Sequence, residues 1–268
     1  MAARELTLSG APVLMYHGLA ASLPAAVGAR EAKYWVSPAA FARHLAQIRE
    51  AGQRVRRLYD FWSGAADGPD NRSAIVLTID DGRATDYEVA FPLLLAAGVR
   101  AEFFVNTATI ERPGHLTWSQ IVEMHRAGMS FQSHAHDHVL LPGMPARLLR
   151  NELETSKRLI EERVGRGVDF LAAPYGLLDR RVIAAARDVG YQAVCSSLSW
   201  PARPGRTVVN RVVVHRDTTA ARFAAILARQ PSAFLPSVAR AALTYLPRRV
   251  LLKVRPRQLG AHLHLEGA

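Results

Sequence analysis

The strongest constraint on this chain is an alternation: short apolar runs of strand length are separated by segments with the start and stop signals of helices. Seven such runs lie at residues 13–16, 74–79, 101–105, 129–133, 168–172, 193–197 and 212–215. Strands that alternate with helices predict an α/β fold, in which helices cover a parallel sheet. From the residues alone, the sheet is either a barrel or an open, doubly wound sheet.

Three of the intervening segments have recognisable helix boundaries. Ser37 precedes Pro38, which is the pattern of an N-cap followed by proline at the first helical position. Thr117 and Gln120 have the spacing of a capping box, and Asp179 is placed as the N-cap of a third helix. A glycine follows the last apolar position of each segment. We therefore expect about six helices around the sheet.

The net charge of +11 is unevenly distributed. Residues 231–268 contain six basic side chains and one acidic side chain, so we divide the chain into a main domain (1–230), which carries the motifs described below, and a basic C-terminal extension (231–268). A basic segment favours an anionic partner. We predict an anionic membrane surface rather than nucleic acid, because the chain has no nucleic-acid-binding motif. One alternative is that the extension is a solvated surface segment, and another is that its apolar residues pack across the main domain as a structural lid.

Composition also limits the location and the kind of site. The single cysteine, Cys195, excludes an intramolecular disulfide framework and any multi-cysteine metal site. The longest unbroken apolar stretch, at 89–99, is far below the roughly 20 residues of a membrane span. The N-terminus lacks the apolar core of a signal peptide. The expected location is cytoplasmic or peripheral to a membrane.

Two adjacent carboxylates, Asp80 and Asp81, directly follow the apolar run at 74–79. In parallel α/β folds the carboxyl ends of the strands carry the active site. Adjacent anions repel, so a functional pair needs two different roles: one binds a cation and the other stays free as a base. The alternative is a solvated Asp-Asp-Gly turn.

Three histidines, His134, His136 and His138, follow the run at 129–133. Two histidines and one carboxylate are a ligand set that leaves a position open for water on zinc. His134 and His138 flank the group, whereas His136 could face away. The cluster therefore predicts a metal site together with the carboxylates after 74–79.

Weaker signals stand at three further strand ends. Residues 173–176 (Ala-Pro-Tyr-Gly) form a tight turn whose amides can point at a ligand. His17 follows the first run, and His215 closes the last one. Taken alone, each of these histidines could equally be structural.

Together these motifs resemble those of the polysaccharide deacetylase family, carbohydrate esterases that remove N- or O-acetyl groups from sugars. The segment 78–82 (Thr-Ile-Asp-Asp-Gly) is similar to the family's Thr-Phe-Asp-Asp-Gly motif, and 134–138 followed by Leu141 resembles its His-(Ser/Thr)-x-x-His-x-x-Leu motif. Residues 172–176 resemble Arg-x-Pro-Tyr-Gly. The opening at 13–17 is typical of a branch that includes poly-N-acetylglucosamine deacetylases. The resemblance covers roughly residues 10–230.

The resemblance implies a distorted, incomplete (β/α) barrel with about seven parallel strands. It implies one divalent metal, most often zinc, and the residues that match the family's ligands are Asp81, His134 and His138. Asp80 matches the general base, and Tyr175 is expected to offer its backbone amide to the oxyanion. These roles fit metal-assisted hydrolysis.

Further roles at the predicted site fall to residues near other strand ends. The family uses a histidine on a late strand to protonate the leaving amine, and we predict His215 for this role. We also predict that His17, Pro174 and Trp200 contact the substrate.

The chain departs from the family pattern at three places. Ala172 stands where the family has the arginine that orients the base, and Ala135 stands where it has serine or threonine after the first metal histidine. The Asp-containing motif that orients the acid histidine is not recognisable around 196–200. Some members of the poly-N-acetylglucosamine branch also lack the arginine.

We therefore expect a metal-dependent hydrolase that removes acetyl groups from N-acetylated amino sugars, in a polysaccharide or a lipid-linked glycan. One alternative is an amide hydrolase with a non-sugar substrate. Another is a catalytically weak glycan-binding homologue, which Ala172 favours and Asp80 disfavours.

Overall fold

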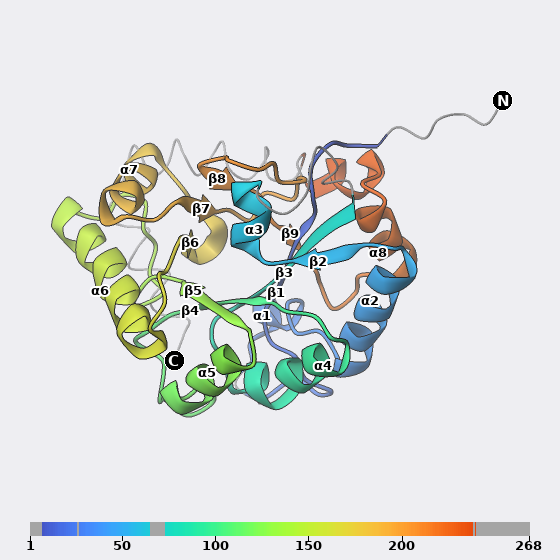
Figure 1. The fold of residues 1–268 in the computed structure, drawn as a ribbon, viewed down its shortest axis with the longest axis horizontal. Coiled ribbons are helices and arrows are strands. Elements are labelled where there is room, and N and C mark those ends of the chain that lie inside the picture. The colour runs from blue at the N-terminus through green and yellow to red at the C-terminus, as the bar shows by residue number, and fades with distance from the viewer. Residues whose placement is uncertain (1–6, 26, 65–72, 238, 240–268) are drawn as a thin grey trace.

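A single curled parallel sheet, with helices around its outside, makes up the fold of the computed structural model, which describes residues 7–25, 27–64, 73–237 and 239 (Figure 1). The strands follow the order β8-β7-β6-β5-β4-β3-β1-β9, and β2 pairs with β3. Their bounds are β1 Val13–Tyr16, β2 Arg54–Arg56, β3 Ala74–Asp80, β4 Glu102–Val105, β5 Ser130–Ser133, β6 Phe170–Ala172, β7 Ala193–Cys195, β8 Val208–Val209 and β9 Val212–Val213. The predicted α/β class and the incomplete barrel are confirmed; β2 and β8 are short strands that the apolar runs did not reveal.

All three segments with recognised boundary signals form helices, and the described residues contain five further α-helices. Their bounds are α1 Ala29–Ala32, α2 Pro38–Glu50, α3 Leu58–Ser63, α4 Phe91–Ala96, α5 Trp118–Arg126, α6 Ala146–Val164, α7 Arg180–Val189 and α8 Ala220–Leu227. All three predicted caps are confirmed: Ser37 accepts from the Ala40 amide, Asp179 accepts from the Val182 amide, and Thr117 closes a capping box at α5. These side chains satisfy amides that the first helical turn leaves unpaired.

Strand β3 separates two apolar layers. Ile75, Leu77 and Ile79 belong to the larger cluster, which lies between the sheet and the surrounding helices, whereas Ala74 and Val76 belong to a smaller cluster inside the barrel. The period of two along a strand explains this division, because successive side chains point to opposite faces. The same alternation directs the last residue of β3 into the barrel.

Helix α3 closes the barrel at the amino ends of the strands and crosses in front of the sheet in Figure 1. Its Leu58 and Phe61 are buried and belong to the interior cluster, with the first residues of β3, β6 and β7. The Leu58 amide donates to the buried carboxylate of Glu102 at 3.0 Å. Because α3 fills the barrel at the amino ends of the strands, a functional site is expected at their carboxyl ends.

The two edges of the sheet lie near each other because β8 and β9 are consecutive in the chain. Only two residues separate Val209 from Val212, so their Cα atoms are at most about 11 Å apart. Neighbouring strands are about 4.8 Å apart, so the gap has room for side chains but not for several strands. Arg211 lies in this connection, and its side chain is buried.

The predicted C-terminal extension is described only at its start. Phe234 is fully buried, and its ring contacts that of Trp200, with the ring centroids 6.2 Å apart. Residues 238 and 240–268 lie outside the described residues, and with them the basic side chains on which the membrane prediction depended. In the part of the chain that is described, no helix has the length and apolar character needed to cross a bilayer.

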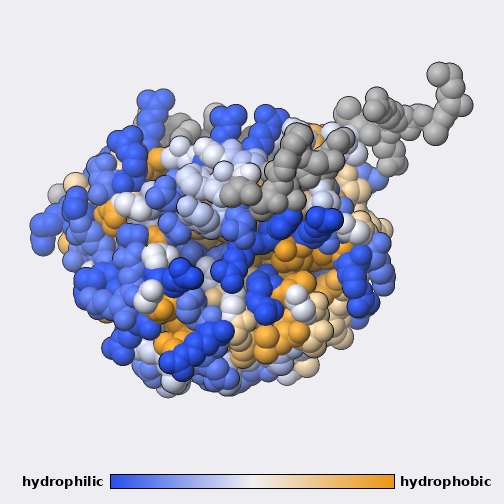
Figure 2. Space-filling view, in the orientation of Figure 1, coloured by the Kyte–Doolittle hydropathy of each residue, from blue (hydrophilic) through white to orange (hydrophobic). Residues whose placement is uncertain are grey.

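On the face in Figure 2, hydrophilic residues cover most of the surface, and apolar residues gather toward α4.

His44 gives the fold a pH dependence that can be tested. Its imidazole is buried on α2, stacks on Phe223 with ring centroids 4.1 Å apart, and lies 3.2 Å from the Tyr16 hydroxyl. Burial, with a smaller effect of Arg43, lowers the pKa of His44 to about 4. Between the ordinary histidine pKa of about 6.5 and this value, the unfolded chain binds more protons, so stability falls as the pH is lowered.

We therefore expect a His44→Gln variant to lose less melting temperature than the parent chain between pH 7 and pH 4.5. Calorimetry at both pH values measures this difference, with His125→Gln on α5 as a matched histidine control. Equal losses in the parent and the His44→Gln variant would contradict the assignment.

Candidate active site

The predicted carboxylates and histidines meet at one edge of the sheet. Asp80 ends β3 and Asp81 follows it, while His134 directly follows β5 and His138 lies four residues further on. Strands β3, β4 and β5 are parallel neighbours, so their carboxyl ends lie side by side. This topology brings together residues that are more than 50 positions apart in the sequence.

Asp81, His134 and His138 form a cluster that fits a metal ion. The Oδ1 atom of Asp81 lies 3.6 Å from the Nε2 atom of each histidine, and the two Nε2 atoms are 3.2 Å apart. Among the described residues, these ligand atoms form a group within 4.8 Å of one another. Two imidazoles and one carboxylate are the donors of a catalytic zinc site with an open position.

The hydrogen bonds of His134 support this fit. Its Nδ1 atom lies 2.8 Å from the carbonyl of Ala172, so Nδ1 carries the proton and Nε2 presents its lone pair to the cluster. Burial lowers the pKa of His138 to about 4, which keeps this imidazole neutral. Although burial opposes it, the carboxylates Asp81 and Asp80 raise the pKa of His134. The two carboxylates thus favour positive charge beside His134, which suits a cation.

The loop that carries the histidines is held from α6. Glu152 is buried, and its Oε2 atom accepts from the amides of His136 and Asp137 at 3.1 and 2.9 Å. Ala135 and His138 both have a positive φ, of 63° and 55°. Residues other than glycine seldom adopt this backbone conformation, so the surrounding structure must hold the loop in place. Glu152 is therefore a structural support that the sequence motifs did not indicate.

Asp80 is paired with Arg211 rather than with a residue of its neighbouring strands. The guanidinium donates two bonds of 2.7 Å, one to each carboxylate oxygen of Asp80. It also donates to the Ser196 carbonyl and the Thr78 hydroxyl, and it lies over the Phe104 ring. A paired guanidinium and carboxylate of this geometry fixes the orientation of both groups.

This pair corrects one expectation from the sequence. Ala172 leaves the position of the family's base-orienting arginine empty, but Arg211 supplies a guanidinium to Asp80 from the connection between the two edge strands, β8 and β9. Ala172 belongs to the same interior cluster as Phe104, on which the Arg211 guanidinium lies. Although burial raises the pKa of Asp80, Arg211 and His134 outweigh it and hold the pKa below its ordinary value.

Tyr175 lies beside the cluster in a strained turn. Its backbone has a φ of 60°, the residue is 52% exposed, and its ring contacts the His138 ring with centroids 5.0 Å apart. The next residue, Gly176, has a φ of +66°, and a Cβ there would lie 1.7 Å from the Ser197 Oγ atom. Only glycine fits at this position, so the turn that presents Tyr175 is fixed by sequence.

The two remaining predicted histidines, His17 and His215, both contact the Tyr34 ring. The ring centroids are 4.9 Å apart for His17 and Tyr34, and 5.4 Å apart for Tyr34 and His215. The pKa of His17 is lowered by burial and is also affected by the charges of Asp81 and Asp80, in the strand-end cluster. The pKa of His215 is lowered by burial and by Lys33, which lies outside that cluster.

The predicted substrate-contacting residues are placed differently from one another. His17 belongs to the neighbourhood of the carboxylates, and Pro174 is buried at the start of the strained turn. Trp200 lies in the connection between β7 and β8 and packs on Phe234. Their contacts with a substrate stay predictions.

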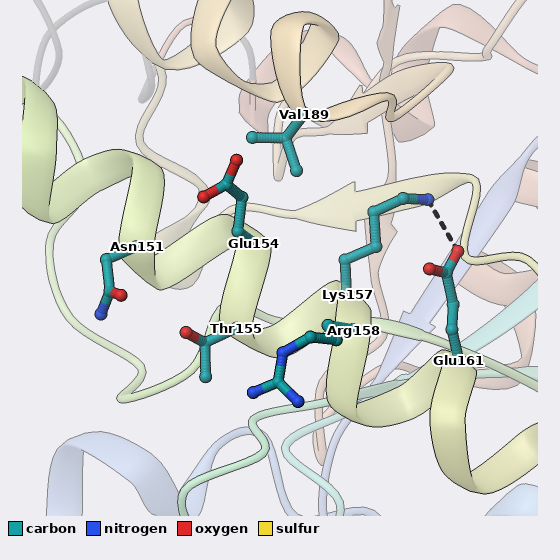
Figure 3. Close-up of a pocket in the computed structure, with 7 residues that line it drawn as sticks. All are labelled: Asn151, Glu154, Thr155, Lys157, Arg158, Glu161 and Val189. Atoms are coloured by element: carbon teal, nitrogen blue, oxygen red, sulfur yellow. Dashed lines mark ion pairs between the residues drawn. The ribbon is translucent and has the colours of Figure 1, made fainter.

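A polar hollow between α6 and α7 lies apart from this cluster. Figure 3 shows its side chains, including the ion pair of Lys157 and Glu161, whose charged atoms are 2.9 Å apart. None of the residues that line it belongs to the strand-end cluster. We assign no chemistry to this hollow.

Comparison with known proteins agrees with the strand-end motifs. The polysaccharide deacetylase family profile matches residues 67–194. YxkH of Bacillus subtilis (strain 168), a protein named for the same family, is 27% identical over 182 residues. That match covers 68% of this chain and 62% of YxkH.

Solved structures with the same fold include relatives from several bacteria. IcaB from Ammonifex degensii is 26% identical with a TM-score of 0.72, and the match covers 84% of this chain and 99% of IcaB. BC0361, a polysaccharide deacetylase from Bacillus cereus, is 25% identical with a TM-score of 0.71, over 82% of this chain and 69% of BC0361. The Streptococcus pyogenes deacetylase PplD, solved in complex with acetate, shares the fold with a TM-score of 0.72 at 24% identity, over 79% of this chain and 95% of PplD.

Proposed function

Because the chain belongs to the polysaccharide deacetylase family, hydrolases that act on carbon–nitrogen bonds, we propose that it removes acetyl groups from N-acetylated amino sugars. The substrate is a polysaccharide or a lipid-linked glycan. The observation that carries the proposal is the position of Asp80, which lies 4.0 Å from the His134 Nε2 atom and outside the ligand set. An ionised carboxylate that lies beside a two-histidine, one-carboxylate cluster without belonging to it is the arrangement that metal-assisted hydrolysis requires.

Asp81, His134 and His138 are the residues that would hold the metal, and we propose zinc because this ligand set is typical of catalytic zinc. When bound, such an ion acidifies water and polarises a carbonyl. Asp80 then accepts the proton of the attacking water at a carboxylate oxygen. Arg211 keeps that carboxylate ionised and fixes its orientation, because a guanidinium nitrogen lies 2.7 Å from each carboxylate oxygen.

Two further groups complete the proposed reaction. The backbone amide of Tyr175 donates to the developing oxyanion, in keeping with the fixed positive-φ turn. For protonation of the leaving amine we now propose His17 in place of His215, because the charges of Asp80 and Asp81 act on His17 directly. His215 contacts the Tyr34 ring, and the charges that act on it are those of Lys33 and of other groups outside the carboxylate pair.

The proposed general acid, His17, is tested by comparing substrates whose leaving groups differ in their need for a proton. An amine must be protonated as it leaves, whereas a nitrophenolate leaves without help. We therefore expect His17→Gln, at saturating metal, to lose about 10²-fold or more in turnover of an N-acetylated sugar and far less in turnover of 4-nitrophenyl acetate. His215→Gln is the matched control. If the selective loss occurs in His215→Gln and not in His17→Gln, the assignment to His17 is wrong.

The substrate class is tested by acetate release from N-acetylglucosamine oligomers and from small non-sugar amides, with an Asp80→Asn variant as the inactive control. We expect release from the oligomers that the control lacks. Turnover of the small amides alone would favour the non-sugar amide hydrolase. Binding of the oligomers without release would favour the catalytically weak glycan-binding homologue.

A further inference from the structure

One oxygen of Asp81 faces the histidines, and the other faces an arginine that the proposed reaction does not use. The Oδ2 atom of Asp81 accepts from the Arg83 guanidinium at 3.1 Å, whereas Oδ1 is the atom 3.6 Å from both histidines. The two oxygens of this ligand are therefore committed to different partners. Asp81 itself has a φ of 85°, so its backbone is also in an uncommon conformation that needs support.

Arg83 is held in place by Glu31 and Trp35, two residues from the segment that follows β1. The guanidinium nitrogen that contacts Asp81 also forms an ion pair with Glu31, on the short helix α1. The guanidinium lies over the Trp35 ring at 4.9 Å, and the Trp35 indole nitrogen donates to the same Glu31 oxygen at 3.2 Å. At its backbone, the Arg83 amide donates to the buried carboxylate of Asp86 at 3.1 Å.

The segment that carries Glu31 and Trp35 is fastened to the end of β1. The Val36 amide donates to the Gly18 carbonyl at 3.0 Å, and the Ala20 amide donates to the Val36 carbonyl at 3.1 Å. A Cβ atom at Gly18 would lie 2.4 Å from the Trp35 ring, so glycine permits this close approach. Glu31 therefore reaches Arg83 from a fixed position.

We propose that Arg83, held by Glu31 and Trp35, is a positioning residue that fixes Asp81 as a one-oxygen ligand of the metal. This inference rests on the metal site proposed above. Groups that hydrogen-bond a ligating carboxylate orient it and tune its affinity for the ion. A lone arginine would also repel a dication, and the carboxylate of Glu31 offsets that charge. Arg83 therefore affects metal affinity in two opposite ways: orientation of Asp81 strengthens binding of the ion, and repulsion by the guanidinium weakens it.

The zinc affinity of Arg83 variants shows which of the two effects is larger. Zinc dissociation constants of the purified chain are measured by competition with a chromogenic chelator, and the melting temperature of each metal-free variant is recorded. We expect Arg83→Met to weaken zinc binding by about 10- to 100-fold, and Arg83→Lys to fall between Arg83→Met and the parent. Arg158→Met is the matched control, because Arg158 pairs with Glu162 on the exposed face of α6.

Glu31 provides the second test, because its loss leaves the Arg83 charge without its partner. Glu31→Gln should also weaken zinc binding, and the double variant with Arg83→Met should bind no more weakly than Arg83→Met alone. Zinc binding by Arg83→Met that equals the parent or is tighter, with an unchanged metal-free melting temperature, overturns the proposal. Additive losses in the double variant overturn the link to Glu31. A parent chain that takes up no zinc overturns the metal site itself, which is a different result.

Discussion

Replacement of Asp80 by asparagine is expected to reduce acetate release by about 10²- to 10⁴-fold while zinc affinity stays close to that of the parent chain. The reason is the division between the two adjacent carboxylates: Asp81 contacts both histidines, whereas Asp80 is paired with Arg211. Asp81→Asn should instead lose zinc affinity by more than the roughly 10- to 100-fold that is typical of changes outside a ligand set.

The matched control for this pair is Asp137→Asn. Asp137 lies in the histidine loop, and its side chain is 55% exposed, so it should change neither activity nor zinc affinity by more than about twofold. Because an asparagine cannot pair with both Arg211 nitrogens, the melting temperature of Asp80→Asn is recorded and the rate is measured well below it. Equal loss of zinc by the Asp80 and Asp81 variants would show that the two roles are assigned wrongly.

The second large effect is expected for Arg211→Met. This change leaves the fully buried carboxylate of Asp80 without its cation, and removal of one partner of a buried ion pair costs about 3–5 kcal/mol of folding free energy. Denaturant unfolding of the metal-free chain measures the loss. Arg211→Met combined with Asp80→Asn should recover part of this stability, because no unpaired charge remains, but it should recover no activity.

Arg211→Met should also move the pH profile of the reaction. Although burial raises the pKa of Asp80, the arginine is the main group that lowers it, with a further effect of His134, so the base stays ionised to a lower pH in the parent chain. Without the arginine the pKa rises, and the acidic limb of the rate profile moves to higher pH. A profile that falls in amplitude but keeps its acidic limb would indicate that Arg211 is structural and does not tune the base.

The strand-end groups could be predicted from the sequence because each one follows a recognisable apolar run. Asp80 and Asp81 follow the run that became β3, and His134 follows the run that became β5. Parallel strands bring such positions to one edge whatever the length of the chain between them. The N-caps were equally predictable, since they depend on side chains within three residues of the helix start.

Arg211 could not be predicted in the same way. Its contact with Asp80 spans 131 residues and depends on how the two edges of the sheet come together, which no local pattern encodes. The chain also has many arginines, since all but three of its 34 basic residues are of this type. The available signal was an arginine inside the apolar stretch 208–214, where a charge needs a buried partner. Arg83 and Glu152 were missed because they act on neighbouring groups and belong to no motif.

The short strands β2 and β8 escaped detection for a different reason. β2 is the segment Arg54–Arg56, with two charged residues out of three, and β8 has two residues. Such segments carry no period of two, and they become strands because β3 and β7 offer unpaired backbone groups beside them. Their pairing is a consequence of the sheet and not of local preference.

The central claim, that one bound metal at Asp81, His134 and His138 serves the base Asp80, is tested most directly by a titration. Metal-free protein is supplied with increasing zinc, and acetate release from N-acetylglucosamine oligomers is followed at each step. We predict that activity rises in proportion to zinc and stops rising at one equivalent per chain, and that His138→Ala shows no such rise. Acetate release that is independent of zinc, or one equivalent of zinc bound at these residues with no acetate released, would contradict the account.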